Sequence, residues 1–183
     1  GPRALAVEAD VADSEEVSRM VETSRDELGD IDILVNNAGY IEGGTLADIT
    51  EEQWDRMMDV HLKGPFLCTK AVAPHMVENG EGRIINIGSV AGYGMAILHY
   101  STAKGGLFSF TKSVARDLAP DGVTVNCVAP GPTVSDLGSD GPKPEEKKEQ
   151  QRENARNNPK YPLGRIGETE DVAEAVLFFA RHD

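Results

Sequence analysis

Short apolar runs of strand length alternate with longer amphipathic stretches along this chain. This alternation constrains the fold more than any other feature, because it is typical of βα units that place parallel strands in one sheet. We expect strands over residues 4–7, 31–35, 83–87 and 123–128, and helices over residues 15–28, 51–79, 100–118 and 171–180. The predicted fold class is therefore α/β, a Rossmann-like, doubly wound parallel sheet with helices on both faces.

Local signals predict where two of these helices begin and where one ends. Ser14 and Thr50 each precede acidic residues at the start of a helical pattern, where a side-chain hydroxyl can cap the first free N–H groups. Gly29 follows the first pattern and is expected to end that helix, because glycine adopts the left-handed conformation without strain.

Composition predicts one domain and excludes several classes of partner. The 183 residues, 39% of them hydrophobic, suffice to bury a core, so we expect a single domain over residues 1–183. The net charge of −13 repels nucleic acid phosphates and anionic membrane surfaces, so neither is an expected partner. The acidic excess fits either a well-solvated surface or adaptation to high salt.

The two cysteines, Cys68 and Cys127, lie in apolar surroundings and lack the spacing of metal ligands. Reduced, buried thiols are the expected state, no metal site is predicted, and a cytoplasmic location is expected. The first nine residues also lack the basic end and the apolar stretch of a signal peptide.

The composition changes between Pro130 and Tyr161, where residues 141–154 are almost wholly polar. One interpretation is a solvated loop with one surface helix. The other is a polar lid over a substrate pocket at about residues 136–160, because long unpatterned insertions in compact domains are often lids. Composition does not separate the two.

Tyr100 and Lys104 are the pair best suited to acid–base chemistry. Four residues apart on a predicted helix, their side chains project from the same face. A tyrosine hydroxyl titrates at about pH 10, and a neighbouring ammonium stabilises its phenolate and lowers that pKa. The pair could then act as a general acid or base, although the same spacing is also common among surface pairs.

Ser89 follows the strand predicted over residues 83–87, at the strand end where ligands bind in open α/β sheets. Its hydroxyl could hold a substrate oxygen beside Tyr100, or it could satisfy a backbone group of a turn. A serine hydrolase is not predicted, because residues 87–91 do not form the Gly-x-Ser-x-Gly turn of that class.

Six short segments, in the right order, resemble the short-chain dehydrogenase/reductase (SDR) family over essentially all 183 residues. Ser89, Tyr100 and Lys104 match its catalytic Ser and its Tyr-x-x-x-Lys motif. The other segments that are similar to family motifs are Asp10-Val11, Asn36-Asn37-Ala38-Gly39, Pro130-Gly131 with the residues that follow it, and Pro162-Leu163-Gly164-Arg165.

The resemblance implies an oxidoreductase that uses NAD or NADP to interconvert a secondary alcohol and a ketone. A 3-oxoacyl thioester reductase or a sugar or polyol dehydrogenase fits best within the family. Tyr100 would exchange a proton with the substrate, Lys104 would hold the ribose hydroxyls and lower the pKa of the tyrosine, and Ser89 would orient the substrate oxygen. The implied cofactor-binding residues are Asp10, Val11, Asn36, Asn37, Ala38, Gly39, Tyr100, Lys104, Pro130, Gly131, Thr133 and Ser135.

Three departures from the family pattern qualify these expectations. His61 stands where the family has the Asn that completes a proton relay; either its imidazole takes over the relay by exchanging protons near pH 7, or it is a buried structural residue. Ser89 and Tyr100 are 11 residues apart, about two fewer than is common, which should reshape the pocket. The glycine-rich phosphate motif and the last strand are not found, so we expect a partial SDR domain that is incomplete at its N-terminus.

The partners implied are a small alcohol or carbonyl substrate and further copies of the chain, because the family usually pairs through its long helices into dimers or tetramers. The alternative function is a non-catalytic dinucleotide sensor or binding protein. Retention of Ser89, Tyr100 and Lys104 together argues against that alternative, because a sensor does not need the reactive pair.

Overall fold

Three parallel strands form the sheet at the centre of the molecule. The computed structural model describes residues 3–94, 97–138, 141–156 and 158–181. The strands β1 (Ile33–Asn36), β2 (Gly82–Ile87) and β3 (Val123–Val128) pair in the order β1-β2-β3. Apolar residues make up at least half of each strand, as is usual for parallel strands that are covered on both faces.

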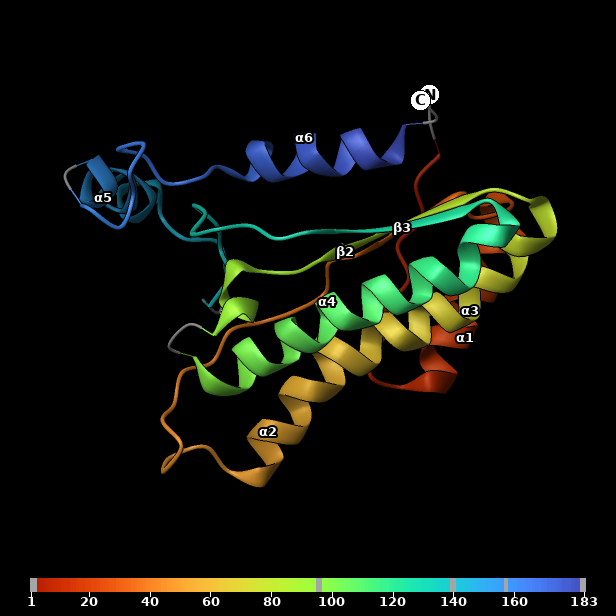
Figure 1. Ribbon diagram of the computed structural model, residues 1–183, viewed down its shortest axis with the longest axis horizontal. Coiled ribbons are helices and arrows are strands. Elements are labelled where there is room, and N and C mark those ends of the chain that lie inside the picture. Colours follow the sequence, from red (N-terminus) through yellow and green to blue (C-terminus); the bar gives the residue numbers. More distant parts are fainter. Residues whose placement is uncertain (1–2, 95–96, 139–140, 157, 182–183) are drawn as a thin grey trace.

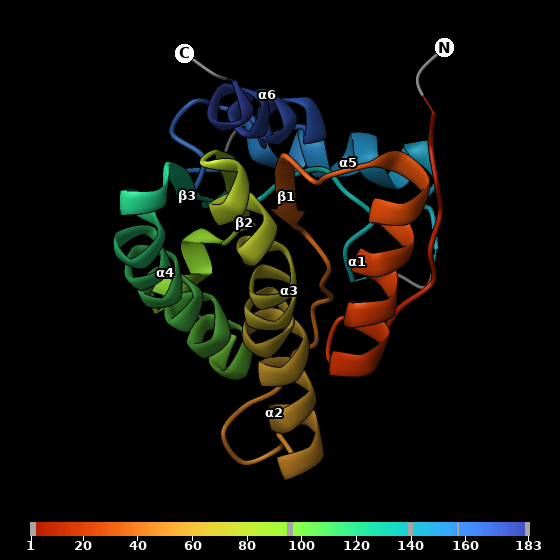
Figure 2. The ribbon, with the colours of Figure 1, turned by 90° about the vertical axis from the view of Figure 1, so that its right-hand side faces the viewer.

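Helices cover both faces of this sheet (Figure 1). The helices α1 (Ser14–Leu28), α3 (Gly64–Asn79) and α4 (Leu98–Leu118) lie on one face, and α6 (Thr169–Ala180) lies on the other. The view along the strands in Figure 2 shows α6 above the sheet and α3 and α4 below it. The predicted α/β class with helices on both faces is confirmed.

The main core lies between the sheet and the layer of α1, α3 and α4. In the strand register, Ile84 of β2 is paired with Leu34 of β1 and with Val125 of β3, so apolar side chains meet across the sheet. The buried members of the core are Val21, Val72, Met76, Ile84, Val123 and Val125.

The helix predicted over residues 51–79 is broken by a π-helical turn. The pieces are α2 (Glu51–Met58), the turn η1 (Asp59–Lys63) and α3. Pro65 explains the break, because it has no N–H to donate to the His61 carbonyl four residues earlier, as a regular α-helix requires. This turn places His61 at the end of the sheet where β1 and β2 finish.

Capping agrees with the prediction at two of three positions. Thr50 caps α2 in a capping box with Gln53, and Gly29 ends α1 with a φ of 96°. The prediction of Ser14 as the cap of α1 was wrong. Asp13 caps this helix, because its Oδ1 accepts from the N–H groups of Glu15 (2.9 Å) and Glu16 (3.0 Å).

Residues 4–7 do not form the strand predicted there. A strand requires a hydrogen-bonded neighbour, and within the described residues the sheet begins at β1, so the apolar run has no partner. Smaller differences are shifts of boundaries: β1 runs over Ile33–Asn36 rather than 31–35, and α4 begins at Leu98 rather than at Tyr100.

The polar segment contains one helix, α5 (Glu145–Arg156), at the end of the molecule where β2 and β3 finish (Figure 1). Two 3₁₀ turns, η2 (Val90–Tyr93) and η3 (Ala119–Asp121), complete the elements. Cys68 is buried, as predicted, whereas Cys127 is half-buried; both are free thiols. None of the helices in the described ranges has the length and apolar character needed to cross a membrane.

Candidate active site

The loops that follow β2 and β3 are joined by backbone hydrogen bonds. The Gly88 N–H donates to the Val128 carbonyl (2.7 Å), and the Val90 N–H donates to the Pro130 carbonyl (3.0 Å). Ser89, which lies between the two donors, is therefore held next to the Pro130 turn. The sequence prediction that these two segments meet at the carboxyl end of the sheet is confirmed.

Two glycines allow η2 to pack directly on α4 and bring Ser89 to Tyr100. A methyl group at Gly92 would lie 2.7 Å from the Phe108 ring and 2.9 Å from the main-chain carbon of Lys104. A methyl group at Gly105 would lie 3.0 Å from the Gly92 carbonyl oxygen. Because any side chain at either position would separate the two elements, the close approach depends on glycine.

Tyr100 lies in the first turn of α4 and is 6% exposed. Burial raises the pKa of its hydroxyl above the ordinary value, because a phenolate loses solvation there, and a hydrogen bond from Ser89 partly offsets this. The Ser89 side chain also accepts from the Ala91 N–H (3.1 Å), which fixes its orientation. The structure thus brings the two predicted catalytic hydroxyls together.

Lys104 is 5% exposed, and its Nζ donates to the Ile87 carbonyl at 2.6 Å. Burial lowers the pKa of this ammonium to about 8. The Nζ atom lies 5.7 Å from the centre of the Tyr100 ring, over its face rather than at its hydroxyl. The expected lowering of the tyrosine pKa by Lys104 is therefore not seen; burial dominates, and the ammonium is held by a strand-end carbonyl.

His61 is 2% exposed and packs edge-on against Tyr100, with 5.2 Å between the ring centres. Its Nε2 is 2.7 Å from the Tyr40 carbonyl and 3.2 Å from the Tyr40 N–H. We assign the ring proton to Nε2, because the shorter contact needs a donor, so Nδ1 carries the lone pair. Nδ1 is buried without a hydrogen-bond partner among the described residues.

The interpretation of His61 as a group that exchanges protons near pH 7 was wrong. Burial and the nearby charge of Lys104 lower the pKa of its imidazole to about 4, so the ring is neutral at physiological pH. A side chain at Gly39 would overlap the ring, so Gly39 is what admits an imidazole at this position.

The side chain of Asn36 is buried and forms its hydrogen bonds within the molecule rather than at an open site. Its Nδ2 donates to Asn86 Oδ1 (2.8 Å), and Asn86 in turn donates to the Thr111 hydroxyl (2.9 Å). This buried chain of hydrogen bonds links β1 to β2 and to α4, so the side chain of Asn36, which the resemblance implied to be cofactor-binding, is engaged in the core. The following residues, 37–39, are exposed at the end of β1.

The comparisons with known proteins agree with this geometry. A family model described as enoyl-(acyl carrier protein) reductase matches residues 1–183. The (2S)-[(R)-hydroxy(phenyl)methyl]succinyl-CoA dehydrogenase subunit BbsD of Thauera aromatica is 44% identical over 184 residues, which are 100% of this chain and 71% of that protein. The chain belongs to the short-chain dehydrogenase/reductase family.

Two further SDR proteins represent different branches of the similarity. The 3-oxoacyl-[acyl-carrier-protein] reductase of Synechocystis is 42% identical, over 98% of this chain and 69% of that protein. The crystal structure of NAD⁺-bound xylitol dehydrogenase matches with a TM-score of 0.78 at 28% identity, over 96% of this chain and 72% of the other. The chain is thus part of an oxidoreductase, and the family implies a nicotinamide cofactor.

One side of this SDR site has room for part of such a cofactor. A pocket of about 440 Å³ lies beside residues 8–11 and is also lined by Gly39, Tyr40 and Arg56. Asp10 and Val11, predicted to bind the cofactor, both line it. The fit is good on this side, because Gly39, which lines the pocket, lies against the His61 ring and so borders the predicted catalytic residues.

Arg56 is a residue of this pocket that sequence reasoning missed. Its Nη1 donates to Asp10 Oδ2 at 2.9 Å, and this hydrogen bond is the main cause of the lowered pKa of Asp10. The Asp10 N–H donates to Glu16 Oε2 at 2.7 Å. Because Arg56 and Asp10 are 46 positions apart on different elements, no local pattern could have paired them.

The predicted nicotinamide segment lies beyond β3. Gly131 is exposed, with open space where a side chain would be. The Thr133 hydroxyl donates to the Gly131 carbonyl (3.0 Å), and the Ser135 hydroxyl accepts from the Leu137 N–H (3.4 Å). Both hydroxyls therefore stabilise their own loop here. Within the described residues no group of three metal-ligating side chains occurs.

Proposed function

We propose that this chain carries the catalytic face of an NAD- or NADP-dependent SDR enzyme that interconverts a secondary alcohol and a ketone. The observation that carries the proposal is the convergence of Ser89, Tyr100 and Lys104 in one buried cluster at the carboxyl end of β2. The Ser89 hydroxyl is close enough to Tyr100 for its hydrogen bond to lower the pKa of the tyrosine, so both hydroxyls could donate to one substrate oxygen.

The cofactor, when bound, supplies or accepts the hydride, and the chain's residues handle the proton. During reduction, Tyr100 donates its proton to the substrate oxygen while the Ser89 hydroxyl stabilises the developing charge. The Lys104 ammonium, with a pKa of about 8, is charged at neutral pH and holds the ribose hydroxyls. Asp10, Val11 and Gly39 would hold another part of the cofactor in the 440 Å³ pocket that they line, and residues 37–38 and the segment from Pro130 to Ser135 would hold the rest.

His61 takes the place of the relay Asn as a neutral group. Its Nδ1 lone pair accepts hydrogen bonds but carries no positive charge near pH 7. Pro65 has no N–H to occupy the His61 carbonyl in helical fashion, which supports a relay that uses the main chain.

The proposed substrate class is a 3-oxoacyl thioester, with a sugar or polyol as the second choice. Support comes from the relatives, of which one is named a (2S)-[(R)-hydroxy(phenyl)methyl]succinyl-CoA dehydrogenase subunit, one a 3-oxoacyl carrier-protein reductase, and the structural neighbour a xylitol dehydrogenase. The single-domain organisation, the lid over residues 136–160 and the cytoplasmic location belong to the same proposal.

Assembly into dimers or tetramers is proposed through the long helices. An apolar pocket of about 300 Å³ opens on their outer face, lined by residues that include Met58, Leu62, Phe66 and Phe110. Phe66 is 45% exposed and packs edge-on against Phe110 at 6.5 Å. Such an apolar surface is suited to burial against another copy.

The test follows NADH or NADPH oxidation by the whole protein with a panel of 3-oxoacyl thioesters and ketoses. We expect Tyr100→Phe to lower kcat by at least about 100-fold, because general acid catalysis contributes that much or more. The matched control is Tyr93→Phe, which removes the same hydroxyl from a side chain that is 79% exposed, and should leave kcat unchanged. Turnover that survives in Tyr100→Phe contradicts the mechanism, and cofactor binding without turnover in the wild type favours the sensor.

A further inference from the structure

The lid helix α5 is joined to α6 by one arginine. Arg152 Nε donates to Glu168 Oε1 at 2.8 Å, and its Nη2 donates to Glu168 Oε2 at 3.1 Å. The remaining Nη1 donates to Glu145 (2.7 Å) and Glu149 (3.2 Å), one helical turn or two before it on α5. A guanidinium that binds one carboxylate through two parallel hydrogen bonds fixes the relative orientation of the two side chains as well as their separation.

The carboxylate that Arg152 grips is itself anchored. Glu168 is the N-cap of α6 and forms a capping box with Asp171, whose Oδ2 accepts from the Glu168 N–H at 2.9 Å. Asp171 also pairs with Arg165 at 2.7 Å. Because α6 packs on β2 and β3, Glu168 is a fixed point on the body of the molecule.

Backbone hydrogen bonds also join the base of the lid to the rest of the chain at a narrow neck. The Val134 N–H donates to the Gly167 carbonyl (2.8 Å), and the Gly167 N–H donates to the Pro132 carbonyl (3.0 Å), so the segment between them is a closed loop. The apolar contacts at its base involve few side chains, and Ala155 is the buried residue that α5 contributes. A loop that is held by backbone hydrogen bonds at its neck can still tilt about that neck. The hydrogen bonds from Arg152 of α5 to Glu168, just beyond the neck, restrict this tilt.

The segment from Pro130 to Ser135, which is predicted to bind the cofactor, adjoins this neck. Lys143 Nζ, at the start of the lid, donates to the Ser135 carbonyl (2.6 Å) and to the Leu137 carbonyl (2.9 Å). A tilt of α5 is therefore transmitted to the part of the chain that leads to the site. Figure 1 shows α5 beyond the ends of β2 and β3. Ser89 follows the end of β2, so α5 and Ser89 lie at the same end of the sheet.

We propose that Arg152 is a positioning residue: through its paired hydrogen bonds to Glu168 it sets where the lid helix lies over the site, and so governs substrate binding without touching the substrate. The inference rests on the proposed function, because it assigns the lid of that same site a specific anchor. Arg152 acts on the Michaelis constant of the carbonyl substrate and leaves the proton transfer by Tyr100 unchanged.

The experiment compares three variants of the whole protein at saturating cofactor. Arg152→Met should raise KM for the carbonyl substrate about tenfold and change kcat less than about twofold, because the lid loses its position while the reacting groups keep theirs. The KM of Arg152→Lys should lie between those of the wild type and Arg152→Met. A lysine ammonium binds the Glu168 carboxylate as a point charge and cannot form the two parallel hydrogen bonds of a guanidinium. Glu168→Gln, which keeps an oxygen for the capping box, should raise KM in the same direction.

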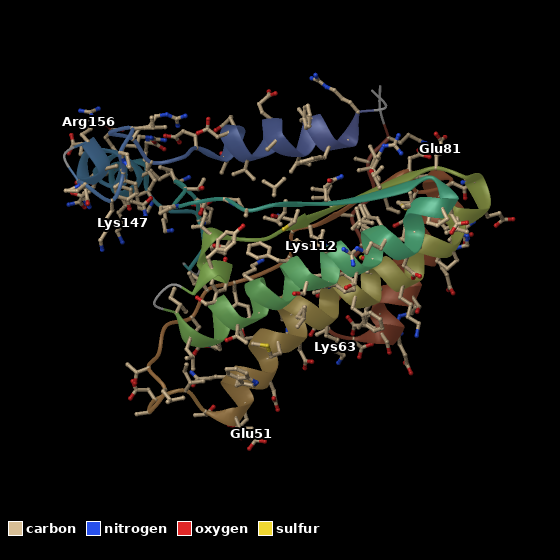
Figure 3. The ribbon with its side chains drawn as sticks, viewed as in Figure 1. Glu51, Lys63, Glu81, Lys112, Lys147 and Arg156 are labelled. Carbon is tan, nitrogen blue, oxygen red and sulfur yellow. The ribbon has the colours of Figure 1, made fainter. Side chains whose placement is uncertain are left out.

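Arg156→Met is the matched control. Arg156 lies on the same helix, is 66% exposed and has only a 3.8 Å contact with Glu149. Figure 3 shows it at the outer end of α5, away from the sheet. This variant should leave KM unchanged.

Amide hydrogen exchange over residues 145–156 supplies a readout that is independent of turnover. Exchange there should be faster in Arg152→Met than in Arg156→Met. The inference is overturned if Arg152→Met keeps the wild-type KM. It is also overturned if Arg156→Met changes KM and amide exchange as much as Arg152→Met does. Failure of the proposed function looks different, because the wild-type protein itself would then show no turnover.

Discussion

The Ser89–Tyr100 cluster and the lid helix α5 lie at the same end of the sheet but are held by opposite kinds of interaction. Tyr100, Lys104 and His61 are each at most 6% exposed, and the pKa of each is shifted mainly by burial. The lid buries few apolar side chains, and exposed or half-exposed ion pairs keep it in place.

The difference shows that the reactivity of the cluster and the access controlled by the lid depend on different physical interactions. Loss of solvation raises the pKa of Tyr100 and lowers those of Lys104 and His61, effects that salt hardly alters. Charge pairs position the lid, and these are screened by salt and insensitive to small changes in packing. Acidification and substitutions that fill space should therefore affect the Ser89–Tyr100 cluster. Ionic strength should affect the position of the lid.

Acid should produce the largest effect, through His61. Its folded-state pKa is about 4 against an ordinary 6.5, so between these values the unfolded chain binds more protons than the folded one. Stability that is fully present above about pH 6.5 should be lost as the pH falls towards 4, by roughly 3 kcal/mol at most. Urea unfolding at pH 7 and pH 4.5 measures this loss.

His61→Asn is the comparison for that experiment. Asparagine does not titrate, so the variant should lose less stability between the two pH values than the wild type, whatever its stability at pH 7. Equal losses in both proteins would show that the ring is not held neutral by its surroundings.

Gly92→Ala should have the next largest effect, because its methyl group would meet Phe108 and the main chain of Lys104 at less than 3 Å. The turn η2 must then move away from α4 and separate Ser89 from Tyr100. We expect kcat to fall about 100-fold, the cost of a displacement of about 1 Å in a catalytic group. Gly43→Ala is the control, because nothing lies within 4 Å of a methyl group there. Normal turnover in Gly92→Ala would mean that the contact is not needed.

The smallest effect should come from salt and should fall on the lid alone. Raising NaCl from about 0.1 M to about 1 M shortens the screening length to about 3 Å and weakens the pairs of Arg152 and Lys148. At saturating cofactor, KM for the carbonyl substrate should rise about two- to threefold with kcat unchanged. The rise should be smaller in Arg152→Met, and an equal rise in that variant would place the salt effect elsewhere.

Much of the fold and part of the site could be predicted from local patterns. The strands 83–87 and 123–128 were correct within a residue, because a short run rich in isoleucine or valine between turn residues favours a strand. Tyr100 and Lys104 were paired by helical spacing, and Ser89 by its place after a strand. The strand predicted over residues 4–7 was wrong because a strand depends on a neighbour. The prediction of Ser14 as a cap was wrong because Asp13, an equally good capping residue, stands one position earlier.

The sequence by itself determined the order of strands and helices, the presence of the reactive side chains and the glycines that let them meet. These properties are local, since they follow from periodicity, capping and the absence of a side chain. Only the tertiary structure decided that His61 is neutral, that Lys104 bonds to Ile87 and not to Tyr100, and that the lid is anchored through Glu168. Desolvation and long-range charge pairs depend on what surrounds a group in space, and no spacing along the chain records that.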